Sequence, residues 1–406
     1  MRHRPRAWLA ALAAVALYAS PAFAQNDPAP DAEATMRLGP LAMKSAFALS
    51  NLGIDTNVFN EAGADGPQSD TTMTFTPTTN LWLRMGRTWV SGTIDVDWVY
   101  YHRFKSERSA NSTYTVDVSR ALNRLALKGG ASRVSTRDRP GFEIDARSQR
   151  AETAFDGEVT MRIFSKTRAG GRAWRRHVEF DQAAVFRDAS LGQQLNRKSS
   201  GTAVTLRHDL TPLTSVSLEI GRDRERFVSS PFRDSDSTRV TANVTLRPLA
   251  LISGDASFGY RRFTPLTGEV PPYRGGTAAV GLSYTVIGAT RLGVEAIRDV
   301  QPSFERTQPY YLETGVTGSV QRQVYGPFDV LARAGVRRLA YRDRIGVVVR
   351  ASDRTDRVRT FSLGAGYRLG LDKRIGFTLD HQERRSSVDE YQYSGLRFGM
   401  SVTYET

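Results

Sequence analysis

The amino-acid sequence predicts an all-β protein, a transmembrane antiparallel up-and-down β-barrel of about 18 strands, with about 16 as the alternative count. Apolar and polar residues alternate along most of the chain, and an export signal precedes them. After that signal the sequence has no apolar run of about 20 residues, which is the length that a membrane helix requires. A closed barrel then remains as the architecture that satisfies every backbone polar group inside a membrane.

Residues 1–24 have the composition of a cleaved signal peptide. Three arginines lie within the first six residues, Trp8 to Ala19 is apolar, and Ala22-Phe23-Ala24 is a small-x-small cleavage site. Because the apolar run is too short to span the hydrocarbon layer, we expect export with cleavage rather than a membrane anchor. The predicted division of the chain is a signal peptide over 1–24, a short periplasmic tail over 25–40, and an outer-membrane β-barrel over 41–406.

Composition limits the possible partners and the way the fold is held. The formal net charge is +14, but basic and acidic residues are spread together through the whole chain, so no nucleic-acid partner is predicted. The chain contains no cysteine. An exported protein of this length must then be held by its backbone hydrogen bonds and its packing instead of disulfides.

The strands are predicted from period-two alternation, in which successive side chains point to opposite faces. The first strand is expected over Leu41 to Val58 and the second over Thr71 to Met85. The third strand alternates clearly from Val90 to Tyr100, and its two aspartates are expected in a wet lumen. The last strand, Tyr393 to Thr406, carries apolar residues at every second position from Leu396 to Tyr404.

Short turns and longer polar loops alternate between these strands, which is the sidedness of an outer-membrane barrel. Short turns are predicted at Gly86, Leu122-Asn123, Ser165-Lys166, Leu210 to Leu213, Pro248-Leu249, Ile287-Gly288, Tyr325-Gly326-Pro327 and Gly370 to Lys373. Longer loops are predicted at Glu61 to Asp70, Thr136 to Arg147, Asp188 to Lys198, Ser229 to Ser237, Pro265 to Arg274, Gln301 to Gln308, Arg342 to Thr355 and Arg385 to Glu390. Eight short turns join nine hairpins and give 18 strands, whereas a false hairpin near Arg133 to Arg150, which alternates poorly, would give 16.

The apolar face of each strand is assigned to lipid and the polar face to the lumen, because charge in hydrocarbon costs about 2–4 kcal/mol at the midplane. The residues predicted to line the lumen are Arg84, Asp95, Asp97, Asp117, Arg207, Glu219, Arg239, Arg247, Asp255, Glu295, Arg333, Arg337, Arg368, Asp380 and Arg397. Both signs occur in similar numbers. Two interpretations stay open for them: cross-strand ion pairing within an inward polar network, or a charged pore constriction.

Aromatic residues near the predicted strand ends are expected at the membrane–water interface, which suits amphipathic rings. They include Trp98, Tyr100, Tyr260, Tyr310 and Tyr311. A barrel of this size is expected to have no apolar core that these rings could fill.

Nothing in the sequence predicts an enzyme. Asp380 and Glu383 lie beside His381, but adjacent strand residues point to opposite faces, so Asp380 is poorly placed to orient that histidine. The chain has no Gly-x-Ser-x-Gly, no His-Glu-x-x-His, no phosphate loop and no cysteine pair. We therefore expect no catalytic residues, no metal site and no cofactor.

The segment Asp55, Thr56, Asn57, Val58 and Phe59 ends the first strand. Together with the leader and the arginine-rich hairpins, it resembles the start of chains in the putative β-barrel porin-2 family of proteobacterial outer-membrane proteins. The resemblance implies an outer-membrane barrel. It also implies a possible link to glycan export, since some members of that family occur with exopolysaccharide production systems.

The predicted function is a porin-like channel for small polar solutes in the outer membrane of a Gram-negative bacterium. The alternative is a channel that exports an anionic exopolysaccharide, and a barrel enzyme is a third class. The expected partners are outer-membrane lipid and lipopolysaccharide, the barrel assembly machinery and, for the alternative function, an exopolysaccharide export system. A loop folded into the lumen would distinguish a channel from a closed structural barrel, but the sequence does not show which loop that would be.

Overall fold

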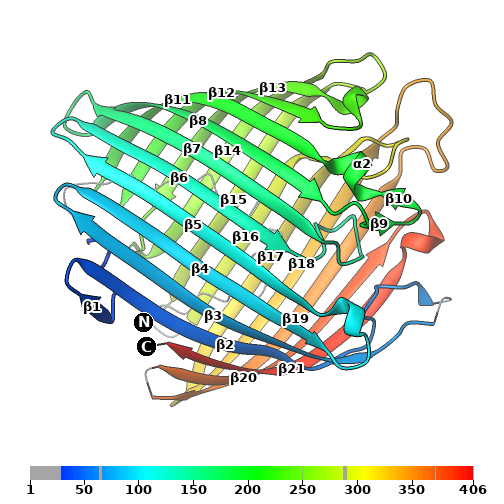
Figure 1. The fold of residues 1–406 in the computed structure, drawn as a ribbon, viewed down its shortest axis with the longest axis horizontal. Coiled ribbons are helices and arrows are strands. Elements are labelled where there is room, and N and C mark those ends of the chain that lie inside the picture. Colours follow the sequence, from blue (N-terminus) through cyan, green and yellow to red (C-terminus); the bar gives the residue numbers. More distant parts are fainter. Residues whose placement is uncertain (1–28, 64–65, 249, 287–289, 371, 406) are drawn as a thin grey trace.

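A computed structural model describes residues 29–405, except 64–65, 249, 287–289 and 371. Within this part of the chain, eighteen long strands form one closed antiparallel barrel (Figure 1). The barrel strands are β2 (Leu41–Asp55), β3 (Asp70–Met85), β4 (Thr88–Tyr101), β5 (Ser109–Ala121), β6 (Leu125–Thr136), β7 (Arg150–Arg162), β8 (Thr167–Phe180), β11 (Arg197–Thr211), β12 (Thr214–Phe227), β13 (Ser235–Leu246), β14 (Ile252–Pro265), β15 (Tyr273–Val286), β16 (Thr290–Pro302), β17 (Tyr310–Tyr325), β18 (Phe328–Arg342), β19 (Thr355–Leu369), β20 (Lys373–Arg385) and β21 (Tyr393–Glu405).

The first and last barrel strands close the ring. β2 pairs with β21 from Ala46↔Glu405 to Asp55↔Arg397, and the two strands run side by side in Figure 1. The register shifts between Leu49 and Leu52 at a bulge, where Asn51 adopts a positive φ of 53°. A side chain at Gly53 would collide with the carbonyl oxygen of Phe398, so this seam needs a glycine beside its bulge.

The predicted fold class and strand count are confirmed. The eight short connections lie at one end of the barrel and the nine longer ones at the other. Three predicted turns fall partly or wholly outside the described residues, at Leu249, at Ile287-Gly288 and at Leu371 within Gly370 to Lys373, although the strands flanking them are described. The segment Arg133 to Arg150 alternates poorly because β6 ends at Thr136 and β7 begins at Arg150, so that most of it leaves the sheet.

Several predicted boundaries differ from the structure, most of all at the loop predicted from Asp188 to Lys198, which already begins after β8 ends at Phe180. β2 ends at Asp55 instead of Val58, because the backbone N–H of Asn57 donates to Oδ1 of Asp55 at 3.1 Å and turns the chain away from the sheet. In the predicted tail, a short strand β1 (Met36–Leu38) pairs with the start of β2. The predicted signal peptide and residues 25–28 lie outside the described part of the chain.

The long loops carry small elements of their own. Residues 181–196 contain the hairpin β9 (Val185–Phe186) and β10 (Ala189–Ser190) and the short helix α2 (Leu191–Leu195). Single 3₁₀ turns lie at Lys105–Glu107, Pro231–Arg233 and Asp389–Tyr391. Among the described helices, none is long and apolar enough to cross a membrane.

An apolar core lies in the mouth at the long-loop end, which corrects the expectation that the barrel has none. Its largest cluster joins four loops and the end of β8, with Phe186, Leu191 and Phe304 among its buried members. A second cluster packs Tyr311 against Tyr341, with ring centroids 5.3 Å apart and the ring planes tilted by 45°. Tyr311 was expected at the membrane interface, but its side chain is on the inner face of β17 and is buried here.

Candidate functional site

The loop of residues 137–149, here called the crossing loop, reaches across the barrel. It leaves the wall between β6 and β7, and the ring order places β17 and β18 diametrically opposite. The ring of Phe142 lies 4.4 Å from Cζ of Arg337 on β18. Glu143 accepts hydrogen bonds from Oγ of Ser303, at 2.5 Å, and from the backbone N–H of Phe304, at 3.1 Å. The loop therefore spans the lumen and contacts the far wall near its mouth.

A buried arginine on β20 ties the crossing loop to that wall. Nη1 of Arg384 donates to Oδ2 of Asp145 at 2.6 Å and to the carbonyl oxygen of Glu143 at 2.8 Å. Its Nη2 donates to Oδ2 of Asp356 on β19 at 2.6 Å. The side chains of Arg384 and Asp356 are both fully buried. Charges buried this deeply persist only when they are paired and hydrogen-bonded, so the loop and the wall depend on each other here.

Arg354 extends the same network into three other loops. It donates to Oδ2 of Asp356 at 2.9 Å and to Oε1 of Glu305 at 2.7 Å. Its Cζ lies 4.0 Å from the ring centroids of both Tyr341 and Tyr391, which is close enough for cation–π attraction. We call Glu143, Asp145, Arg354, Asp356 and Arg384 the latch cluster, because together they fasten the crossing loop.

Arg139 fastens the crossing loop at a second place, together with the Asp55–Phe59 segment, which we call the family-like motif. Nη2 of Arg139 donates to the carbonyl oxygen of Val58 at 2.7 Å, and its Nε donates to that of Asp145 at 2.5 Å. Asn57 is buried and its Nδ2 donates to the carbonyl oxygens of Glu61 and Ser394, at 2.9 and 3.0 Å. The motif thus ties β2 to the start of β21 through Asn57, and its Val58 carbonyl oxygen accepts the hydrogen bond from Arg139 of the crossing loop.

The other members of the motif are also packed. Nε of Arg397 donates to Oδ2 of Asp55 at 3.1 Å, across the seam between β2 and β21. Phe59 packs edge-on against Phe104, with ring centroids 4.9 Å apart. The predicted strand end at the rim is therefore the place where three segments far apart in the sequence meet.

Burial sets the protonation of one latch carboxylate. It raises the pKa of Glu143 from 4.5 to about 7, while Ser303, Arg354 and the N–H of Phe304 favour the charged form and Glu305 disfavours it. If the loop leaves its seat, this carboxylate returns to water and to its ordinary pKa. Protonation at Glu143 therefore favours the latched loop.

We expect the crossing loop to loosen as the pH rises from 4.5 to 7 and to change little above 7, where the carboxylate is ionised in both states. The chain has no cysteine, so Gly141→Cys would report loop exposure through labelling with a membrane-impermeant thiol reagent. A Cβ at Gly141 meets no atom within 4 Å, and the same is true of Gly268 in another loop. The measured quantity is the labelling rate of Gly141→Cys divided by that of Gly268→Cys. This ratio cancels the pH dependence of the thiol itself. With Glu143→Gln added, this ratio should no longer depend on pH between 4.5 and 7. If the ratio changes with pH equally with and without Glu143→Gln, Glu143 is not the group that controls the loop.

The register places the residues predicted to line the lumen on one face of the sheet, the face that the crossing loop contacts at Arg337. These residues are Arg84, Asp95, Asp97, Asp117, Arg207, Glu219, Arg239, Arg247 (directly after β13), Asp255, Glu295, Arg333, Arg337, Arg368, Asp380 and Arg397. The intervening outer positions carry exposed apolar side chains such as Val204, Phe258 and Val336. That these charges meet a permeating solute stays a prediction.

Many of these charges are paired along the wall. The closest N–O separations are 2.6 Å for Arg337 with Glu313, 2.8 Å for Arg239 with Asp223, and 3.4 Å for Arg333 with Glu295. Other pairs join Arg207 to Asp209 and Arg368 to Asp329, at 3.5 and 3.6 Å.

Several acids in the predicted set are held by hydroxyl groups, as Asp95 and Asp97 accept from Thr78 and Thr76, Asp380 from Ser362, and Glu219 from Thr205. Asp117 and Asp156 both lie over Gly130, where no side chain intervenes. Arg84 donates to the carbonyl oxygen of Gly86 in the turn beside it, and Asp255 is exposed.

Sequence reasoning predicted a longer loop at Thr136 to Arg147 but missed that this loop crosses the lumen, and it missed the latch cluster. The signal available in the sequence was the poor alternation of Arg133 to Arg150, combined with Phe142 beside the acids Glu143 and Asp145 in a nominally polar loop. The partner Arg384 carried no signal, because it occupies an ordinary inward position beside the outward Arg385.

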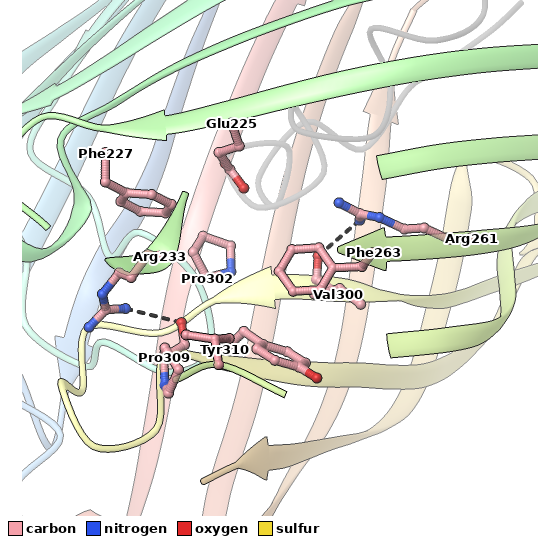
Figure 2. A pocket seen from close by; sticks show the side chains of 10 residues that line it. Glu225, Phe227, Arg233, Arg261, Phe263, Val300, Pro302, Pro309 and Tyr310 are labelled. Carbon is pink, nitrogen blue, oxygen red and sulfur yellow. Dashed lines mark hydrogen bonds between the residues drawn. The ribbon is translucent and has the colours of Figure 1, made fainter. Parts of the chain in front are cut away.

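A small pocket lies beside the latch cluster, where β15 and β16 part at the long-loop end. Their pairing stops at Ala278↔Arg298, and a cluster that includes Phe263, Val270 and Tyr310 fills the gap. Figure 2 shows Arg233 and Arg261 at two sides of this pocket, donating to the carbonyl oxygens of Pro309 and Val300 at 3.0 and 3.4 Å. Both guanidiniums are buried and donate to backbone carbonyl oxygens. The residues around the pocket therefore fill the break between β15 and β16 and do not form an open binding site.

Comparison with known proteins agrees with this architecture. The fold is similar to that of a BenF-like porin from Pseudomonas fluorescens Pf-5, at 9% sequence identity and a TM-score of 0.52, over 91% of this chain and 99% of that one. It is also similar to OccK2 (OpdF) from Pseudomonas aeruginosa, solved in complex with glucuronate, at 11% identity and a TM-score of 0.50, over 89% and 97% of the two chains. At these identities the likeness shows the fold alone. No curated protein matches the sequence.

A family model describes most of the sequence. The model for Putative beta-barrel porin 2 matches residues 30–406, which includes the Asp55–Phe59 segment and every strand of the barrel. With the closed 18-strand barrel, this match places the protein in the outer membrane. The chain therefore belongs to the Putative beta-barrel porin 2 family, and it is a porin-like channel for small solutes.

Proposed function

We propose that the protein passes small polar solutes across the outer membrane along a path narrowed by the crossing loop. One observation carries the proposal: residues 137–149 span the lumen and are fastened to the far wall by the latch cluster. A segment held in this way reduces the free cross-section near the mouth. Such an arrangement can select solutes by size at the level of the crossing loop.

The wall below the crossing loop suits polar solutes of either sign. Paired groups such as Arg337 with Glu313 and Arg239 with Asp223 offer donors and acceptors without a large net field. A solute can exchange its hydration for these groups as it passes. We therefore infer weak selectivity between cations and anions.

The alternatives draw no support from a specific observation. An exported polysaccharide would need a continuous passage through the level at which the crossing loop lies, so that loop would have to unlatch for a polymer to pass. Transport without catalysis, cofactor or metal is part of the proposal. Export through a cleaved signal peptide and insertion by the barrel assembly machinery are proposals too, and N-terminal sequencing of the mature protein tests the first of them.

The test is single-channel conductance in planar bilayers. Thr136 and Arg150 are paired across the hairpin, so residues 137–149 can be replaced by a two-residue Asn-Gly turn without moving β6 or β7. We expect the conductance to rise severalfold and larger neutral sugars to enter liposomes that contain the variant. The control shortens the loop of residues 266–272, which joins β14 to β15 and has no described hydrogen bond or ion pair to the crossing loop. Unchanged conductance after removal of the crossing loop would contradict the proposal.

A further inference from the structure

Outward-facing arginines gather on the barrel wall at the long-loop end. On β18, Arg337 points inward to Glu313, so its neighbour Arg338 lies on the outer face with Val336, and both side chains are exposed. By the same alternation, five more arginines lie on the outer face, namely Arg262 of β14, Arg274 of β15, Arg298 of β16, Arg357 of β19 and Arg385 of β20. We call these six residues, including Arg338, the outer basic belt.

The strand register sets like charges against one another in this belt. Arg262 stands directly opposite Arg274, and Arg357 stands between Arg338 and Arg385. Like charges at directly opposed positions destabilise a sheet. Arg385 is offset by Glu383, 2.7 Å away, and Arg298 donates to Oγ1 of Thr314.

The side chains of the other four belt residues, Arg262, Arg274, Arg338 and Arg357, make no hydrogen bond or ion pair with any described residue. Each of their side chains is exposed. Their mutual repulsion is thus not offset within the described chain, and a negatively charged partner from outside would offset it.

The position of the belt relative to the apolar band fixes where that partner lies. Toward the short-turn end, the outward residues become apolar on three of these strands, at Tyr260 below Arg262, at Val336 below Arg338, and at Phe361 beyond Arg357 and Arg359. These three side chains are 52%, 42% and 50% exposed. Charge is costly within hydrocarbon, so the belt lies at the level of the lipid head groups. At the short-turn end, the corresponding outward positions of these strands are held by residues such as Val330 and Tyr367.

We propose that the outer basic belt binds the phosphate groups of an anionic glycolipid in the outer leaflet, the lipopolysaccharide expected as a partner from the sequence. A guanidinium presents a planar fork that matches phosphate oxygens bidentately. One phosphate between Arg338 and Arg357, or between Arg262 and Arg274, pairs with both cations and removes their repulsion. The belt gathers outward arginines at the long-loop end, whereas near the short-turn end the outward Arg322 stands opposite the apolar Val330. This uneven distribution matches a membrane that carries the lipid in one leaflet.

The test measures binding of a bisphosphorylated lipid A to the purified, folded barrel in detergent by native mass spectrometry. Arg338→Gln with Arg357→Gln should weaken binding about tenfold, as expected from the loss of charge-assisted hydrogen bonds. Arg322→Gln is the control, since Arg322 is an outward, exposed arginine near the short-turn end of β17, opposite Val330. It should leave binding unchanged, and both proteins should keep their heat-modifiable gel migration.

The remaining outcomes decide the identity of the ligand. Removing one and then both phosphates from the lipid should lower its affinity stepwise, and inorganic phosphate should fail to displace it. Equal binding of the dephosphorylated lipid, full displacement by inorganic phosphate, or parent-like binding by the double variant would each overturn the proposal. If the double variant does not fold, the single substitutions Arg338→Gln and Arg357→Gln apply, and each should weaken binding about threefold.

Discussion

Arg384→Met is expected to destabilise the folded barrel by about 3–5 kcal/mol and to free the crossing loop. The substitution keeps much of the side-chain volume but leaves Asp145 without its 2.6 Å partner in a buried site. Asp356 keeps Arg354 but loses its second cation. An uncompensated buried charge is among the largest single-residue penalties in a folded protein. The free energy of unfolding in lipid vesicles, measured by denaturant titration, gives the effect.

The adjacent residue supplies a matched control for this substitution. Arg385 is on the outer face of the same strand, its side chain is 63% exposed, and its ion pair with Glu383 is at the surface. Arg385→Met should therefore change the unfolding free energy by no more than about 1 kcal/mol. Adding Asp145→Asn to Arg384→Met should recover part of the loss, because it removes the stranded charge. Equal losses for Arg384→Met and Arg385→Met would show that the latch cluster does not stabilise the barrel.

A second large effect is expected where one strand turns one residue to lipid and the next to the lumen. Val204, near the middle of β11, is 67% exposed on the outer face. Val204→Arg would place a charge in hydrocarbon and should cost about 2–4 kcal/mol. Thr205 faces inward and donates to Oε2 of Glu219 at 3.4 Å, so Thr205→Arg would meet an acid in a wet interior. It should fold nearly as well as the parent.

Folding yield of both variants into the same lipid vesicles decides between the two faces. A one-residue slip of register would exchange them, so the assignment is all or none. Normal insertion of Val204→Arg with failure of Thr205→Arg would mean that the faces are reversed.

The barrel could be predicted from the sequence because its determinants are local. Alternation from Val90 to Tyr100 depends on neighbouring residues only, and a turn such as Gly86 needs one glycine in a left-handed conformation. Strand order then follows, since each strand in an up-and-down barrel pairs with its neighbour in sequence. The Asp55–Phe59 segment identified the strand end at the rim for the same local reason.

The candidate site could not be predicted, because its contacts join residues far apart in the sequence. Glu143 and Ser303 are 160 residues apart, and Asp145 and Arg384 are 239 residues apart. The alternation of apolar and polar residues carries no information about contacts between residues so far apart in the sequence. Tyr311 shows the same limit: its aromatic ring near a strand end indicated an interface position, whereas Phe142 of the crossing loop covers it from inside.

The seam between β2 and β21 determines when the barrel can close. Asp55 and Arg397, which pair across it, are 342 residues apart, so ring closure carries a large loop-closure entropy and waits for the final strand of the chain. Until then both β2 and β21 expose a row of unpaired backbone groups, to which strands of other molecules can add. The family-like motif at the end of β2 is thus part of the last joint to form, and substitutions there should slow ring closure and leave more of the chain open to aggregation.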